Sequence, residues 1–93
     1  MSTPQRAQAY GGVIRQIDDL SGAKLHSDEQ AVVREAADSL LFTDGLDRDP
    51  AAERALVELY ALADRMVDAE RITRERAGEL VRAVESCGPA LAA

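Results

Sequence analysis

The chain has 93 residues, the size of one domain, and 17 of its hydrophobic residues are alanines beside one Phe, two Tyr and no Trp, which predicts a thin core. One Cys excludes an internal disulfide and a cysteine-based zinc site, and one His excludes the usual multi-histidine metal sites. No apolar run approaches the roughly 20 residues that a transmembrane helix needs, and the N-terminus shows no secretory signal, so we expect a cytoplasmic protein with no membrane partner.

The net charge of −6 is concentrated in the middle of the chain. Residues 27–53 sum to −6, whereas residues 1–26 sum to +1 and residues 54–93 to −1. This acidity disfavours direct binding to nucleic acid, which needs Lys and Arg against the phosphates, and is compatible with a basic surface on a protein partner. About half of the acidic residues in this segment lie at predicted helix starts, where a negative charge interacts favourably with the helix dipole. The sequence therefore leaves open whether residues 27–53 form a functional patch or only a solvated face.

The first predicted helix is amphipathic, but two glycines interrupt it. Its apolar stripe has the spacing of one helical face and consists of Tyr10, Val13, Ile14, Ile17 and Leu20. Each glycine inside a helix costs roughly 1 kcal/mol against alanine. Either the helix starts near Gly12 behind a flexible arm of residues 1–10, or it is continuous and Gly11 and Gly12 allow close backbone contact. We favour the continuous helix, ending at Ser21-Gly22, and expect it to be short or weakly packed.

The second predicted helix has the clearest start. Ser27 is expected to be the N-cap, with Gln30 at the third helical position as a capping box requires. The helix then buries a stripe of apolar residues: Val33, Ala36, Ala37, Leu40 and Leu41. Phe42 closes it, and Gly45 is expected to end it in the left-handed conformation.

The third and fourth helices follow from cap and stop signals. Asp49-Pro50 is an N-cap followed by proline at the first helical position, and this helix should run to about Ala69. Thr73 caps the last helix, which should end at Cys87-Gly88-Pro89 with Gly88 left-handed, leaving residues 88–93 as a frayed tail. The connection between the two is short, so the fold expected is an all-α four-helix bundle of residues 1–93 with these helices as an antiparallel hairpin.

No motif for catalysis or for metal binding is convincing. Cys87 and His26 could pair as nucleophile and base, but nothing orients them, and a cysteine near a helix C-terminus lacks the dipole that lowers its pKa. Asp47 and Asp49 suggest a calcium loop, yet Ala52 stands where that loop needs glycine. No glycine-rich phosphate loop is present. We therefore expect no catalytic residues, no metal and no cofactor.

The last two helices have the spacing of a helix-turn-helix. The candidate phosphate contacts are Arg71, Arg74, Arg76 and Arg82. Glutamates interleave with them, namely Glu70, Glu75, Glu79 and Glu85. This pattern is typical of a self-neutralised, solvent-exposed face, so a DNA-binding function is the least favoured of the three considered.

The favoured function is a non-catalytic, acidic protein–protein interaction module, either a small regulator or an assembly subunit. It would dock an apolar stripe rimmed by the acidic segment. The candidate partner-binding residues are Asp28, Glu29, Glu35, Asp38, Leu41, Phe42, Asp44, Leu46, Asp47 and Tyr60. Whether Phe42, Leu46, Tyr60 and Leu62 line the core or the surface is left open.

Two alternatives remain at this point. The first is an acidic inhibitor that occupies the nucleic-acid-binding groove of another protein, as small phage or mobile-element proteins such as anti-CRISPRs can. The second concerns assembly: a thin core favours self-association into a homodimer, because a second copy would cover further apolar surface.

Overall fold

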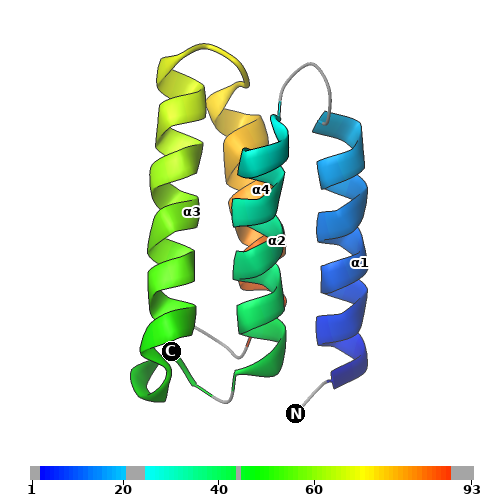
Figure 1. The fold of residues 1–93 in the computed structure, drawn as a ribbon. Coiled ribbons are helices and arrows are strands. Elements are labelled where there is room, and N and C mark those ends of the chain that lie inside the picture. The colour runs from blue at the N-terminus through cyan, green and yellow to red at the C-terminus, as the bar shows by residue number, and fades with distance from the viewer. Residues whose placement is uncertain (1–2, 21–24, 44, 89–93) are drawn as a thin grey trace.

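The computed structural model describes residues 3–20, 25–43 and 45–88. Within them the chain forms α1 (Thr3–Leu20), α2 (Ser27–Phe42), the 3-10 turn η1 (Leu46–Arg48), α3 (Pro50–Asp68) and α4 (Arg74–Glu85). Figure 1 shows the chain running up α1, down α2, up α3 and down α4. The predicted all-α four-helix bundle is confirmed.

All four helices contribute to one core. α2 packs against each of the other three, α1 packs against α4, and α3 packs against α4. The largest fully buried side chains include Ile17 of α1, Leu40 of α2, Leu59 of α3 and Leu80 of α4. Alanines such as Ala36 are also fully buried, and small residues let the helix axes approach closely.

The first helix is longer and better packed than expected. Residues 3–10 continue α1, so of the two alternatives the continuous helix is confirmed over the part of the chain that the structure describes. Val13 and Ile17 are buried, so the expected short or weakly packed helix is wrong. The close-contact explanation for Gly11 and Gly12 is wrong too, because a Cβ at either position would meet only the Arg15 side chain at 3.8 Å. The predicted stop at Ser21-Gly22 lies outside the described residues.

The start of α2 is shifted by one residue from the prediction. His26, in an extended conformation, is the N-cap, and Ser27 is already helical. The backbone N–H of His26 donates to Oε1 of Glu29 at 2.9 Å, so Glu29 takes the role expected of Gln30. Gln30 instead donates from Nε2 to the Leu25 carbonyl at 3.0 Å. Glu29 stands at the third helical position because His26 is the N-cap, and it also accepts hydrogen bonds from Arg71, a contact that sequence spacing does not show.

The caps of the last two helices are confirmed. The Asp49 carboxylate accepts a hydrogen bond from the Ala52 N–H at 3.1 Å, and the Thr73 hydroxyl accepts one from the Arg76 N–H at 3.1 Å. The first of these bonds is the main reason that the pKa of Asp49 lies below its usual value. Both residues stabilise helix starts by satisfying backbone donors that no carbonyl reaches.

Two glycines expected to be left-handed are not. Gly45 is extended, with φ of −179°, and Gly88 does not have a positive φ either. Gly88 allows a close approach instead, because a Cβ there would lie 3.1 Å from Cβ of the buried Leu40. A Cβ on Gly45 would lie 2.9 Å from Oδ1 of Asp47, whose exposed side chain can move aside. The rest of the predicted frayed tail, residues 89–93, lies outside the described residues.

The left-handed residue that the bundle does use is Glu70, with φ of 59°. It ends α3 in a Schellman motif, because the Arg71 N–H donates to the Met66 carbonyl and the Glu70 N–H to the Val67 carbonyl, both at 2.9 Å. The turn places α4 against α3. The left-handed conformation of Glu70 is sterically strained, because its Cβ lies close to the following carbonyl oxygen.

We expect Glu70→Gly to raise the free energy of unfolding by about 1 kcal/mol, because glycine adopts this conformation without strain. Urea unfolding followed by circular dichroism measures the change. Glu70→Ala is the matched control and should not stabilise, since it keeps the Cβ. Equal stability of the Gly and Ala variants would contradict the strain.

Arg6 joins the C-terminal ends of two helices. Its Nε donates to the Cys87 carbonyl at 2.8 Å, just beyond α4. One terminal nitrogen donates to the carbonyls of Leu40, Leu41 and Thr43 at the end of α2, at 2.6, 3.0 and 2.9 Å. The last carbonyls of a helix lack intrahelical partners and carry partial negative charge, so a guanidinium satisfies both requirements at once.

Candidate functional site

The candidate partner-binding residues do not form one patch. Asp28, Glu35 and Phe42 are exposed and follow each other at intervals of seven residues, so they share the outer ridge of α2. Phe42, at the end of this ridge, is 81% exposed, and the alternative that it lines the core is wrong. Asp44 lies outside the described residues.

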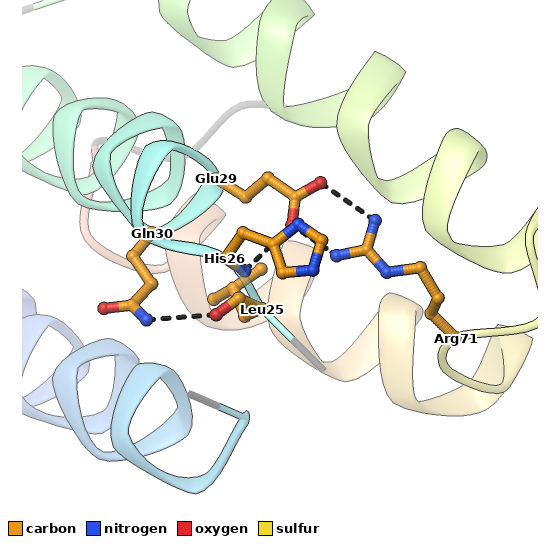
Figure 2. Close-up of polar contacts among 5 residues, drawn as sticks. All are labelled: Leu25, His26, Glu29, Gln30 and Arg71. Carbon is orange, nitrogen blue, oxygen red and sulfur yellow. Dashed lines mark hydrogen bonds and ion pairs between the residues drawn. The ribbon is translucent and has the colours of Figure 1, made fainter. Parts of the chain in front are cut away.

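Glu29 is engaged within the protein. Both of its carboxylate oxygens accept from the guanidinium of Arg71, one of them at 2.9 Å, so the start of α2 is tied to the turn between α3 and α4 (Figure 2). The hydrogen bond from Arg71 is the largest cause that lowers the pKa of Glu29 to about 2, with further lowering from the His26 backbone N–H. Glu29 therefore serves the fold, because its carboxylate is engaged by Arg71 within the chain.

Three more candidates lie at least partly inside the bundle. Asp38 is half-buried beside Tyr10 of α1, and its carboxylate is the main cause of a raised pKa of the Tyr10 hydroxyl. Leu41 is half-buried, and Leu46 packs against the core. Leu62, left open in the sequence, is 1% exposed and belongs to the core.

Phe42 and the turn that follows it form what we call the Phe42 surface: Phe42, Gly45, Asp47, Arg48 and Asp49. Except for Asp47, these residues line an open hollow of about 220 Å³ together with Thr43. Asp47 is exposed beside it, and its carboxylate lies over Gly45. The turn thus combines one large exposed ring with two carboxylates and one guanidinium.

Tyr60 lies on another side of the molecule. It is 37% exposed, and its hydroxyl donates to Oε2 of Glu85 on α4 at 2.5 Å. Burial, followed by the Glu85 carboxylate, raises the pKa of Tyr60 to about 12. Tyr60 therefore belongs to the α3–α4 side, apart from the ridge of α2.

Val57, which was not among the predicted residues, is 58% exposed on α3. Further along α3, this helix and α4 enclose a groove of about 250 Å³ lined on α3 by Ala63, Asp64, Val67 and Asp68, and on α4 by Arg74, Ala77, Gly78 and Val81. The signal was available: Val57 falls outside the buried stripe of its helix, and an apolar residue on the polar side of a helix has no core to enter.

Two of the four arginines considered for DNA are used within the chain. Arg71 binds Glu29, and Arg76 lies 3.8 Å from Oδ2 of Asp19 and 3.7 Å from Oε1 of Glu79. These ion pairs weigh against a helix-turn-helix function, because phosphate contacts need arginines that are free to displace counterions.

The candidate nucleophile and base are far apart. Cys87 is buried beyond the end of α4, His26 precedes α2, and Figure 1 places these two helix ends at opposite ends of the bundle. Burial raises the pKa of the Cys87 thiol to about 11, which is unfavourable for a nucleophile. In the described part of the chain, no three His, Cys, Asp or Glu side chains gather as a metal site would need.

Comparison with protein-family models, with curated proteins and with solved structures finds no match to this chain. A search of the described helices for one that is long and apolar enough to cross a bilayer also finds none.

Proposed function

We propose that this chain is a non-catalytic protein–protein interaction module, a regulator or an assembly subunit, that docks through the Phe42 surface. The observation that carries the proposal is the 81% exposure of the chain's one Phe. A fully buried Phe side chain contributes roughly 2–3 kcal/mol through the hydrophobic effect, and leaving it in water forgoes that contribution. Aromatic side chains that project from a rigid element are typical anchors of interfaces.

The charges beside Phe42 specify the chemistry of the partner. Asp47 and Asp49 flank the ring with one opposing charge, Arg48, and Glu35 lies further along the same ridge of α2. A partner that fits offers an apolar pocket for the ring and Lys or Arg at the rim. Complementary rim charges steer such an encounter, while the buried ring supplies the affinity.

Phe42→Ala should abolish partner binding while changing the free energy of unfolding by less than about 0.5 kcal/mol, because an exposed side chain leaves no cavity. Urea unfolding checks the stability and direct titration of the partner checks binding. Glu58→Ala, which truncates an exposed side chain of α3 outside the Phe42 surface, is the control and should bind normally.

The partner itself is found by replacing Phe42 with a photo-crosslinking phenylalanine analogue in the native cell. The same analogue at the exposed position of Glu58 provides the background. A protein that crosslinks from position 42 and not from position 58, and that no longer binds Phe42→Ala, supports the proposal. Equal crosslinking from both positions would refute docking through the Phe42 surface.

Salt separates this function from the acidic inhibitor of a nucleic-acid-binding groove. Docking of the ring should change little as salt rises, whereas a mimic of nucleic acid should lose affinity steeply. The helix-turn-helix alternative is tested by a gel shift at low salt, with Arg74 and Arg76 replaced by Ala. A parent protein that shifts no DNA ends that alternative.

A further inference from the structure

The outer side of α3 and α4 has a repeated surface pattern. On α3 the exposed residues Val57, Ala61, Asp64 and Asp68 are spaced four, three and four residues apart, which places them on one face of the helix. On α4 the same spacing places Arg74, Gly78, Val81 and Glu85 on one face. The apolar groove between α3 and α4 lies between these two faces.

The two rims of the groove carry opposite charge at the same height. Asp64 and Asp68 of α3 and Arg74 of α4 all line the groove. None of these three has an ion-pair partner among the described residues. At the other end Glu85 is engaged by the Tyr60 hydroxyl. Within the groove lining, the charges without an ion-pair partner are therefore Asp64 and Asp68 on the α3 rim and Arg74 on the α4 rim.

We propose that this groove is the interface of a symmetric dimer, occupied by a second copy of the chain. A twofold axis parallel to the helices brings α3 of one copy opposite α4 of the other. Each residue keeps its position along the helix direction under this rotation. Asp64 and Asp68 of each copy then face Arg74 of the other copy. Because the axis is twofold, the same set of ion pairs forms at two equivalent places in the dimer. The exposed Val57 and the groove residue Val81 lie inside the resulting set of four helices, α3 and α4 from each copy.

The size of the groove side sets the strength of the dimer. α4 has 12 residues, which is about 18 Å of helix, and two neighbouring helices are about 20 Å wide. That footprint is roughly 360 Å² as a flat rectangle, less than half of the about 800 Å² that a standard specific interface buries on each partner. The dimer should therefore form and dissociate with concentration rather than be permanent.

Sedimentation equilibrium of the full chain over a range of concentrations tests the proposal. The parent protein should show a mass that rises from monomer to dimer. Arg74→Glu alone, and Asp64→Arg with Asp68→Arg, should each raise the dissociation constant at least about tenfold by placing like charges opposite each other. The protein carrying all three substitutions should recover the dimer, because it restores opposite charges across the axis.

Glu58→Arg and Arg65→Glu provide the matched controls. Both residues are exposed on α3 but on the flank away from the groove, so reversing their charges should leave the dissociation constant unchanged. Far-UV circular dichroism confirms that each variant is folded.

A parent protein that stays monomeric at every concentration would overturn the dimer. So would a dimer that persists in Arg74→Glu, or a triple variant that does not recover. None of these results bears on docking through the Phe42 surface, which lies at the end of α2 and is tested separately by crosslinking.

Discussion

Arg6→Met should lower the free energy of unfolding by about 3 kcal/mol, the largest effect that we expect from one substitution. Hydrogen bonds to a charged group contribute about 1.5–3 kcal/mol each, and those that share one guanidinium are not additive. The Arg6 side chain makes four of them, to carbonyls of α2 and of the segment after α4. Removing the guanidinium leaves several carbonyls at helix ends without this hydrogen-bond donor. It also removes the hydrogen bonds that link the end of α2 to the segment after α4.

Arg6→Lys should recover less than half of the loss. An ammonium group is a compact charge and cannot reach both helix ends, whereas the planar guanidinium donates in two directions. Arg15→Met is the control, because Arg15 is an exposed arginine on the same helix and its loss should cost within about 0.5 kcal/mol. Urea unfolding measures all three variants. If Arg6→Met and Arg15→Met were equally stable, Arg6 would not hold the helix ends together.

The second large effect is a loss of stability in acid that depends on Glu29. Its pKa is lowered from 4.5 to about 2 by folding, so the ionised carboxylate stabilises the native state above the pKa of the unfolded chain. That contribution, about 2 kcal/mol for a pair that water still partly reaches, should be lost as the pH falls from about 5 to about 2.

Glu29→Gln isolates this contribution. The variant should be less stable than the parent near neutral pH, and the difference should shrink as the pH falls toward about 2 and approach zero below that pH, where the parent carboxylate is also protonated. Urea unfolding at a series of pH values measures both curves. In the Arg71→Met background, the same Glu29→Gln change should cost much less, since the main partner is gone. A difference that does not vary with pH would show that Glu29 acts only through the shape of its side chain.

The comparison of Asp49 and Thr73 with Glu29 shows what could be predicted. The first two are caps whose partners lie three residues away, and the sequence identified both. Glu29 was predicted to bind another protein. Its actual contact, Arg71 of the same chain, is 42 residues away, and sequence spacing does not show it. Gly88 was placed at the right helix end but for the wrong reason, since its small size matters because Leu40 approaches it, and Leu40 is distant in the sequence.

Phe42 shows the same limit at the surface. The periodicity of α2 places it at the end of the buried stripe, and only the packing of the neighbouring helices decides that nothing covers it. Val57 was not predicted, because the apolar periodicity of α3 marks its buried stripe and not its outer side.

The sequence by itself determined four helices, their buried faces and most of their caps, because these depend on residues within a turn or two of each other. The tertiary structure decided which charges remain available and which hold the bundle together. Arg6 is 34 to 81 residues from the carbonyls that it binds, and no local pattern encodes such a distance. The opposite rims of the α3–α4 groove likewise exist only once two helices lie side by side, because each rim alone is an ordinary exposed helix face.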